Sequence, residues 1–150
     1  MDTSSHNLFE EFFIPVLSRS IRYDRGVGFF SAGWLQMAAS GMVEFARNSG
    51  RARWVTSPIL SEADWQALQL GTVARVNEVL QRSLDAGLDN LEEALTEDTL
   101  SALAWLVADG ILDFRLALPR NKLEKGMFHD KFGVFADAEG NLLSFAGSYN

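Results

Sequence analysis

The apolar residues of this chain switch repeatedly between helical spacing and strand spacing. Trp34, Met37, Met42 and Phe45 recur at helical intervals, whereas the segment RARWVTSP, residues 51–58, alternates polar and apolar side chains. A chain in which both periods follow one another favours a layered α/β structure. At 150 residues, 47% of them apolar, the chain is long enough for one domain with a single core.

The spacing predicts the element order α, β, α, β, α, α, β, β, β. The predicted helices lie near 7–17, at 33–50, from Ser61 onward and at 100–108; the predicted strands lie at 25–31, 51–58 and 111–119, followed by two strands around the turn DAEGN, residues 137–141. Ser61 with an acid three residues later is typical of a helix start, and Gly50 and Gly110 suit helix ends. The acidic stretch 85–98 is predicted to be a solvated loop between helices.

Composition excludes several classes of protein. Twenty acidic and thirteen basic side chains give a net charge of −7, so a nucleic-acid contact would have to use a local basic patch. The chain has no cysteine, hence no disulfide and no thiolate nucleophile, which fits a reducing cytoplasm. The N-terminal apolar run is short, flanked by acids and broken by Pro15, so we expect neither a signal peptide nor a membrane partner.

The segment MFHDKFGVFADAEGNLLSFAGSYN, residues 127–150, holds the most reactive side chains. In a strand, period-two alternation puts His129 and Lys131 on one face, about 7 Å apart, with Phe128, Phe132 and Val134 turned into the core. The hairpin is expected to return Gly147, Ser148 and Asn150 toward His129. Lysine, hydroxyl and amide groups donate to phosphate oxygens, glycine permits close approach of a ligand, and an imidazole nitrogen can attack phosphorus.

This His-x-Lys pair followed by Gly-Ser-x-Asn resembles the signature of the phospholipase D superfamily, which includes bacterial nucleases and certain restriction endonucleases. More closely, HDKFGVFADAEGNLLSFAGSYN, with YDRGVGFFSAGWL and RARWVTSPILSEAD, resembles the N-terminal phospholipase D-like domain of bacterial helicases of restriction and phage-defence type. The resemblance implies an α-β-α sandwich with a mixed central sheet and helices on both faces. It also implies that residues 1–150 form the N-terminal part of a longer chain.

The resemblance implies a two-step phosphodiester mechanism without metal or cofactor. His129 would attack phosphorus to give a phosphohistidine, while Lys131, Ser148 and Asn150 hold the nonbridging oxygens. A second histidine must protonate the leaving oxygen, and the only other one, His6, has no such motif around it. A complete site therefore needs a homodimer of two motifs or a second half outside this sequence.

The function implied is a phosphodiesterase, most readily a nuclease that acts on DNA within a helicase or defence protein. The alternative is a noncatalytic DNA-binding, dimerisation or partner-docking module of a helicase; phospholipid hydrolysis is a weaker option.

The family places an Asp five residues after the Lys, where this chain has Ala136, and turn chemistry accounts for the neighbouring Asp137. The dipeptide His129-Asp130 also occurs in metal-dependent phosphohydrolases, but the other ligands are missing.

Several features allow a structural reading beside a functional one. Arg120, Lys122 and Lys125 precede the motif and form either a phosphate-binding track or a solvated charged loop. Without the Gly-Ser-x-Asn motif, His129 would be interpreted as a structural histidine held by a hydrogen bond. The remaining polar candidates are Ser31, Thr56 and Ser57 as ligand groups or helix caps, and Arg51 and Arg53 as phosphate ligands or, more readily, salt-bridge partners.

Glycines and tryptophans are expected to serve packing. The glycines of RGVGFFSAG fail the dinucleotide-binding spacing, because Gly33 follows Gly28 by five residues rather than three, so close backbone approach explains them better. The tryptophans sit in apolar patterns and are predicted to be core residues: Trp34, Trp54, Trp65 and Trp105.

Overall fold

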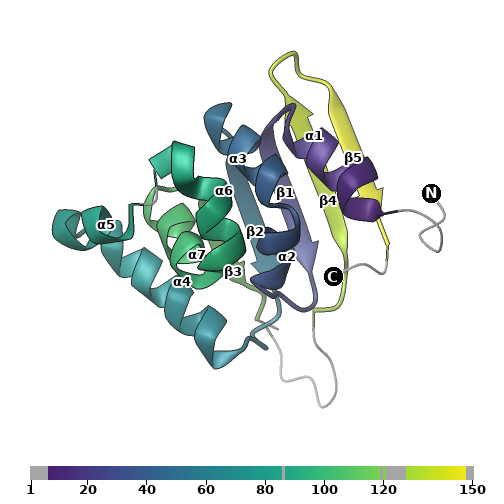
Figure 1. The fold of residues 1–150 in the computed structure, drawn as a ribbon. Coiled ribbons are helices and arrows are strands. Elements are labelled where there is room, and N and C mark those ends of the chain that lie inside the picture. Colours follow the sequence, from purple (N-terminus) through teal and green to yellow (C-terminus); the bar gives the residue numbers. More distant parts are fainter. Residues whose placement is uncertain (1–6, 86, 119, 121–127, 148–150) are drawn as a thin grey trace.

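A five-stranded mixed sheet forms the centre of the molecule in the computed structural model, which describes residues 7–85, 87–118, 120 and 128–147 (Figure 1). The strands are β1 (Ser20–Val27), β2 (Arg51–Thr56), β3 (Leu112–Leu116), β4 (Phe132–Asp137) and β5 (Leu142–Ala146). Their order across the sheet is β3-β2-β1-β4-β5. The first three strands are parallel, β4 runs antiparallel to β1, and β5 antiparallel to β4. The parallel half and the hairpin therefore meet at β1.

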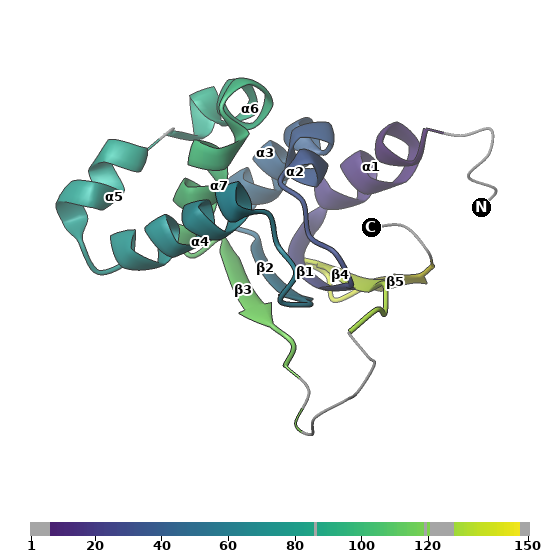
Figure 2. The same cartoon turned by 90° about the horizontal axis from the view of Figure 1, so that it is seen from below.

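The helices lie together along one face of this sheet, as Figure 2 shows. They are the π-helical turn η1 (Phe9–Phe13), which continues into α1 (Ile14–Leu17), and then α2 (Gly33–Met37), α3 (Ala39–Arg47), α4 (Glu62–Ala74), α5 (Glu78–Leu84), α6 (Gly87–Glu97) and α7 (Thr99–Ala108). The α/β class with a mixed central sheet is confirmed, and the arrangement is consistent with an α-β-α sandwich. Among the described residues the helices lie on this one face, so the predicted helices on the opposite face are not found there.

An aromatic core fills the space between sheet and helices. Tyr23 of β1 stacks on Phe135 of β4, with ring centroids 4.1 Å apart and planes 9° from parallel. Trp34 of α2 meets Trp54 of β2 edge to face at 5.2 Å, and Phe13 packs against Trp34 in the same way. All five side chains are buried. Burial of so much aromatic surface at the junction of β1, β2 and β4 fixes the two halves of the sheet to one another.

Several predicted elements are confirmed. The first helix and the strand at 51–56 lie where the spacing placed them. Ser61 caps α4 by accepting a hydrogen bond from the Asp64 amide at 3.0 Å. Gly110, which follows the end of α7, has a φ of 74°, a conformation that favours glycine over other residues. The predicted helix 33–50 is instead two helices, α2 and α3, that meet at Ala38.

The prediction of a loop at 85–98 is wrong, because most of this stretch forms helix α6. Leu91 and Leu95 lie one helical turn apart and are completely buried, while Glu92 and Glu93 are exposed. Two apolar residues at the right spacing are enough to attach an otherwise acidic helix to the core.

The predicted strand 25–31 is shifted, since β1 begins at Ser20 and ends at Val27. Tyr23, Arg25 and Val27 alternate toward the helices and are all buried. Because Arg25 is charged, the alternation of buried and exposed residues in β1 is not apparent from the sequence.

The prediction that Phe132 and Val134 point into the core is also wrong. Gly133 and Phe135 face the helices, whereas Phe132 remains 41% exposed on the opposite side of β4. The stack of Phe135 on Tyr23 decides the orientation, because residues paired across two strands lie on the same face. The alternation within β4 was therefore predicted correctly and its orientation was not, and His129 and Lys131, predicted to lie in this strand, precede it.

Arginines and aspartates cover the face of the sheet away from the helices. Arg53 makes two hydrogen bonds to Asp24, at 2.6 and 2.7 Å, so the salt bridge expected for Arg53 is confirmed. These bonds hold the pKa of Asp24 below its usual value. On β3, Arg115 pairs with Asp113 at 3.1 Å. Arg51 donates to the Gly50 carbonyl oxygen at 3.0 Å.

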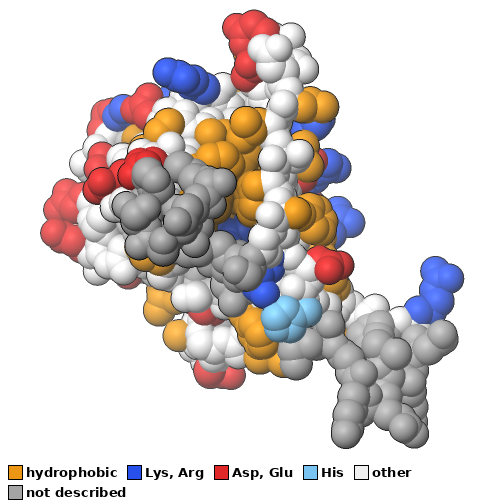
Figure 3. Space-filling model, turned by 90° about the vertical axis from the view of Figure 1, so that its right-hand side faces the viewer, with side chains coloured by type: hydrophobic (Ala, Val, Ile, Leu, Met, Phe, Trp, Pro, Cys, Tyr) orange, Lys and Arg blue, Asp and Glu red, His pale blue; other side chains and the backbone are white. Residues whose placement is uncertain are grey.

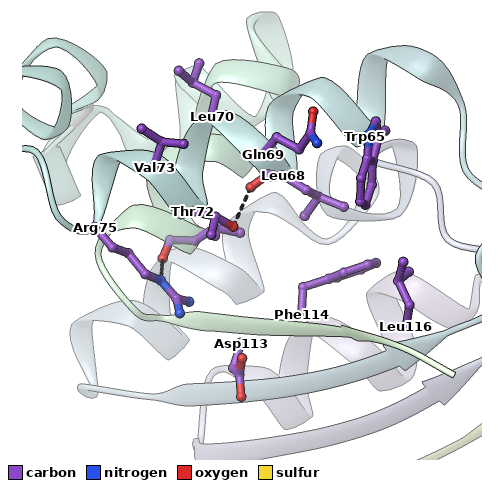
Figure 4. Close-up of a pocket in the computed structure, with 11 residues that line it drawn as sticks. Trp65, Leu68, Gln69, Leu70, Thr72, Val73, Arg75, Asp113, Phe114 and Leu116 are labelled. Carbon is purple, nitrogen blue, oxygen red and sulfur yellow. Dashed lines mark hydrogen bonds between the residues drawn. The ribbon is translucent and has the colours of Figure 1, made fainter.

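A cavity of about 790 Å³ lies between α4 and β3 at the edge of the sheet (Figure 4). Its walls are mainly apolar and include Leu68, Phe114 and Leu116. Trp65 stands at its rim and is 38% exposed, which corrects the prediction of a core position for this tryptophan. None of the helices in the described part of the chain has the length and apolar character that a membrane crossing requires.

We predict that Leu91→Ala lowers the free energy of unfolding by about 2–5 kcal/mol, because it leaves a cavity under α6. Glu93→Ala, two residues along on the exposed side of the same helix, is the matched control and should change stability by less than about 0.5 kcal/mol. Urea unfolding followed by circular dichroism measures both. Equal, small effects of the two substitutions would contradict a packed helix at Gly87–Glu97.

Candidate functional site

Segments from distant parts of the sequence meet at one end of the sheet. Gly28 follows β1, Ser57 follows β2, and Lys131 immediately precedes β4. The Ser57 hydroxyl donates a hydrogen bond to the Gly28 carbonyl oxygen and so ties the ends of β1 and β2 together. The carboxyl ends of parallel strands are the position at which open α/β sheets most often bind ligands.

His129 and Lys131 have their side chains in contact at this end of the sheet. Lys131 Nζ lies 3.1 Å from His129 Nδ1. A lysine ammonium can only donate, so Nδ1 is the acceptor and a neutral imidazole must carry its proton on Nε2. His129 is exposed and Lys131 half-buried, and Figure 3 shows the described histidine, in pale blue, at the surface next to a basic side chain.

Gly28 supports the backbone of His129. A Cβ atom at Gly28 would lie 3.1 Å from His129 Cα and 3.2 Å from the Phe128 carbonyl oxygen. The backbone atoms of Phe128 and His129 cannot give way easily, so only glycine fits without a shift. A Cβ at Gly26 would likewise collide with the Phe132 ring. The expected close approach of backbones is confirmed at Gly28, whereas Gly26 makes room for a side-chain ring.

Gly147 lies beside Lys131 at the end of the hairpin. Its amide donates to the Lys131 carbonyl oxygen at 3.1 Å, which extends the β4–β5 ladder past the ends of both strands. Of the other predicted site residues, Arg120 is exposed, and Ser148, Asn150, Lys122 and Lys125 lie outside the described residues. The structure thus brings His129, Lys131 and Gly147 together.

Sequence reasoning missed Arg25, a buried charge close to this site. Arg25 is 4% exposed, and its guanidinium lies 4.4 Å from the ring centre of Trp34 and 5.2 Å from that of Trp54. These distances are within the range of cation–π attraction. The sequence contained one indication that Arg25 is buried, because Arg25 lies between Tyr23 and Val27 at the spacing of one strand face.

A small cavity of about 130 Å³ opens beside Arg25 and the start of α2. Its lining includes Phe29, Phe30, Trp34 and Met37. Phe29 also meets the His129 imidazole edge to face, with centroids 5.7 Å apart and planes at 88°. One aromatic ring therefore separates the histidine from the cavity.

The other polar candidates have structural surroundings. Ser31 accepts a hydrogen bond from the Gly33 amide at 3.2 Å, but the N-cap position of α2 is Ala32, so the prediction of Ser31 as the helix cap is one residue off. Thr56 is fully buried, and its hydroxyl has no hydrogen-bond partner within the described part of the chain. The same holds for the Tyr23 hydroxyl, whose pKa is raised by burial.

Asp137 serves the turn, as turn chemistry predicts. Its carboxylate accepts from the Asn141 side chain and amide, both at 2.8 Å, and from the Glu139 amide at 3.0 Å. The bond from the Asn141 side chain is the main reason why the pKa of Asp137 is lowered. Within residues 7–85, 87–118, 120 and 128–147 no three His, Asp or Glu side chains are grouped as metal ligands.

Comparison of the chain with protein-family models, with curated protein sequences and with solved structures gave no match. The relation to the phospholipase D superfamily therefore remains a prediction from the motifs.

We predict that Gly28→Ala displaces the backbone of His129 and destabilises the fold by about 1–3 kcal/mol, as overpacking does. Heteronuclear NMR should show shifted His129 imidazole resonances, assigned by their absence in His129→Ala. Gly147→Ala is the matched stability control, since a Cβ there has no neighbour within 4 Å. Unchanged His129 resonances in Gly28→Ala would contradict this contact.

Proposed function

We propose that the chain is a phosphodiesterase-type domain of the phospholipase D superfamily that cleaves DNA through a phosphohistidine at His129. The observation that carries the proposal is the contact of Lys131 Nζ with His129 Nδ1 at 3.1 Å, at the end of the sheet and beside Gly147. The DNA preference and the attachment to a helicase or defence protein come from the sequence resemblance.

In the proposed reaction, an imidazole nitrogen of His129 forms a bond to phosphorus and the bond to the leaving oxygen breaks. Lys131 stabilises the charge on the nonbridging oxygens. The leaving oxygen takes a proton from an acid, and water then hydrolyses the phosphohistidine and regenerates the imidazole. General acid–base help alone is worth roughly 10²–10⁴-fold, so covalent catalysis and charge stabilisation must provide the rest.

The resting contact between Lys131 and His129 has a mechanistic consequence. While Lys131 donates to Nδ1 and Nε2 carries the proton, neither imidazole nitrogen has a lone pair available for attack. Lys131 must therefore leave Nδ1. A phosphate oxygen carries a negative charge, which the neutral imidazole lacks, and therefore attracts the ammonium more strongly. The substrate itself would thus draw Lys131 away and activate the histidine.

A second copy of the chain is proposed to supply the acid. His6 and His129 are the only histidines, and only His129 belongs to a His-x-Lys pair. Two copies related by a two-fold axis would bring two such pairs to one scissile bond, one as nucleophile and one as acid.

Hydrolysis of a labelled oligonucleotide in excess chelator tests the nucleophile. We expect His129→Ala to lose roughly 10³-fold or more of the activity, because the covalent step is abolished. His6→Ala is the matched histidine control and should retain activity. Activity that survives His129→Ala would reject the nucleophile, and a folded, DNA-binding but inactive protein would favour the noncatalytic module.

Mixing the wild type with His129→Ala tests the shared site. If each dimer uses one histidine as nucleophile and the other as acid, an equal mixture after subunit exchange retains about a quarter of the wild-type activity. Independent sites would retain about half. Light scattering at the assay concentration must show a dimer, and a fully active monomer would contradict this arrangement.

A further inference from the structure

We propose that the cavity beside Arg25 receives one pyrimidine base of the substrate, so that the preferred DNA is single-stranded or locally unpaired. The inference rests on the proposed function for the place of the phosphate at His129. It adds a binding site for the base and a substrate class.

The size of the cavity is the first argument. Its volume is about 130 Å³. A cavity of about 150 Å³ is known to hold one benzene ring, whereas sites for whole drug-sized ligands run to about 300–1,000 Å³. One six-membered ring fits, and a base pair does not.

The chemistry of the walls is the second argument. Phe29, Phe30 and Trp34 are aromatic and Met37 is a thioether, so the lining favours a flat apolar ring over a free phosphate. Arg25 is the charged residue of the lining and lies against the rings of Trp34 and Trp54.

The position of the cavity is the third argument. Phe29 lines it and also contacts the His129 imidazole at 5.7 Å between ring centres. Within one nucleotide a single sugar joins phosphate and base, so a nucleotide with its phosphate at His129 can place its base past Phe29. The rim is accessible, since Met37 is 53% exposed and Phe29 is half-buried.

These three arguments imply that the preferred DNA substrate is unpaired. A base inside a duplex would have to be flipped out to enter the cavity, which costs a few kcal/mol, whereas a single-stranded base stacks on an aromatic wall directly.

Binding of small probes to the full chain tests the inference. Isothermal titration with thymidine 5′-monophosphate, deoxyadenosine 5′-monophosphate and deoxyribose 5-phosphate separates the pyrimidine, the purine and the sugar phosphate. We expect thymidine monophosphate to bind most tightly and Phe29→Ala to weaken it about 5- to 150-fold, the range for loss of one stacked base. Deoxyribose 5-phosphate should bind Phe29→Ala and the wild type equally.

Phe132→Ala is the matched control, an exposed phenylalanine on the opposite side of the sheet, and should leave all three affinities unchanged. The inference is overturned if thymidine monophosphate binds no more tightly than either other probe, if no binding is detected, or if Phe29→Ala weakens nucleotide and sugar phosphate alike. His129→Ala separates the two proposals. Loss of oligonucleotide hydrolysis tests the nuclease, whereas selectivity for thymidine monophosphate over sugar phosphate tests the cavity.

Discussion

The pairing of β1 with β4 is the constraint on which the rest of the structure depends. It joins the two halves of the sheet, and the stack of Tyr23 on Phe135 at 4.1 Å fixes its register on the side that the helices cover. In this register Gly26 lies opposite Phe132 and leaves room for its ring, while Gly133, opposite Arg25, leaves room for the ring of Phe145 from β5. A slip of one residue would turn every side chain of β4 to the other face of the sheet.

The same register builds the candidate site. Because Gly26 pairs with Phe132, continuation of the two strands carries Gly28 past the backbone of His129, and the hydrogen bond from Gly147 to Lys131 continues the neighbouring ladder. The three segments are distant in the sequence, so this arrangement arises only when the whole sheet forms. Ser57 adds the end of β2 through its bond to Gly28. Contacts between backbone atoms thus position the reactive side chains of the candidate site.

Sequence reasoning recovered what local patterns determine and missed what tertiary packing determines. The cap at Ser61, the alternation of β2 and the turn at Asp137 depend on neighbours in the sequence and were predicted correctly. Helix α6 was missed because its two fully buried residues, Leu91 and Leu95, stand in an otherwise acidic stretch. The orientation of β4 depends on Tyr23, and Arg25 is stabilised by Trp34 and Trp54 from other elements. No short window of sequence contains these partners.

Lys131 connects substrate binding to reactivity in the proposed mechanism. With its ammonium on Nδ1, His129 is held in one tautomer and protected from adventitious electrophiles. A neutral ligand offers Lys131 no better partner than the imidazole, whereas a phosphodiester does, since its oxygens carry a negative charge that attracts the ammonium and the neutral imidazole carries none. A base held beside Phe29 would keep the phosphodiester in place during this exchange. Selectivity for a nucleotide would thus begin when Lys131 releases the His129 imidazole. The second copy of the chain would donate its proton to the leaving oxygen afterwards.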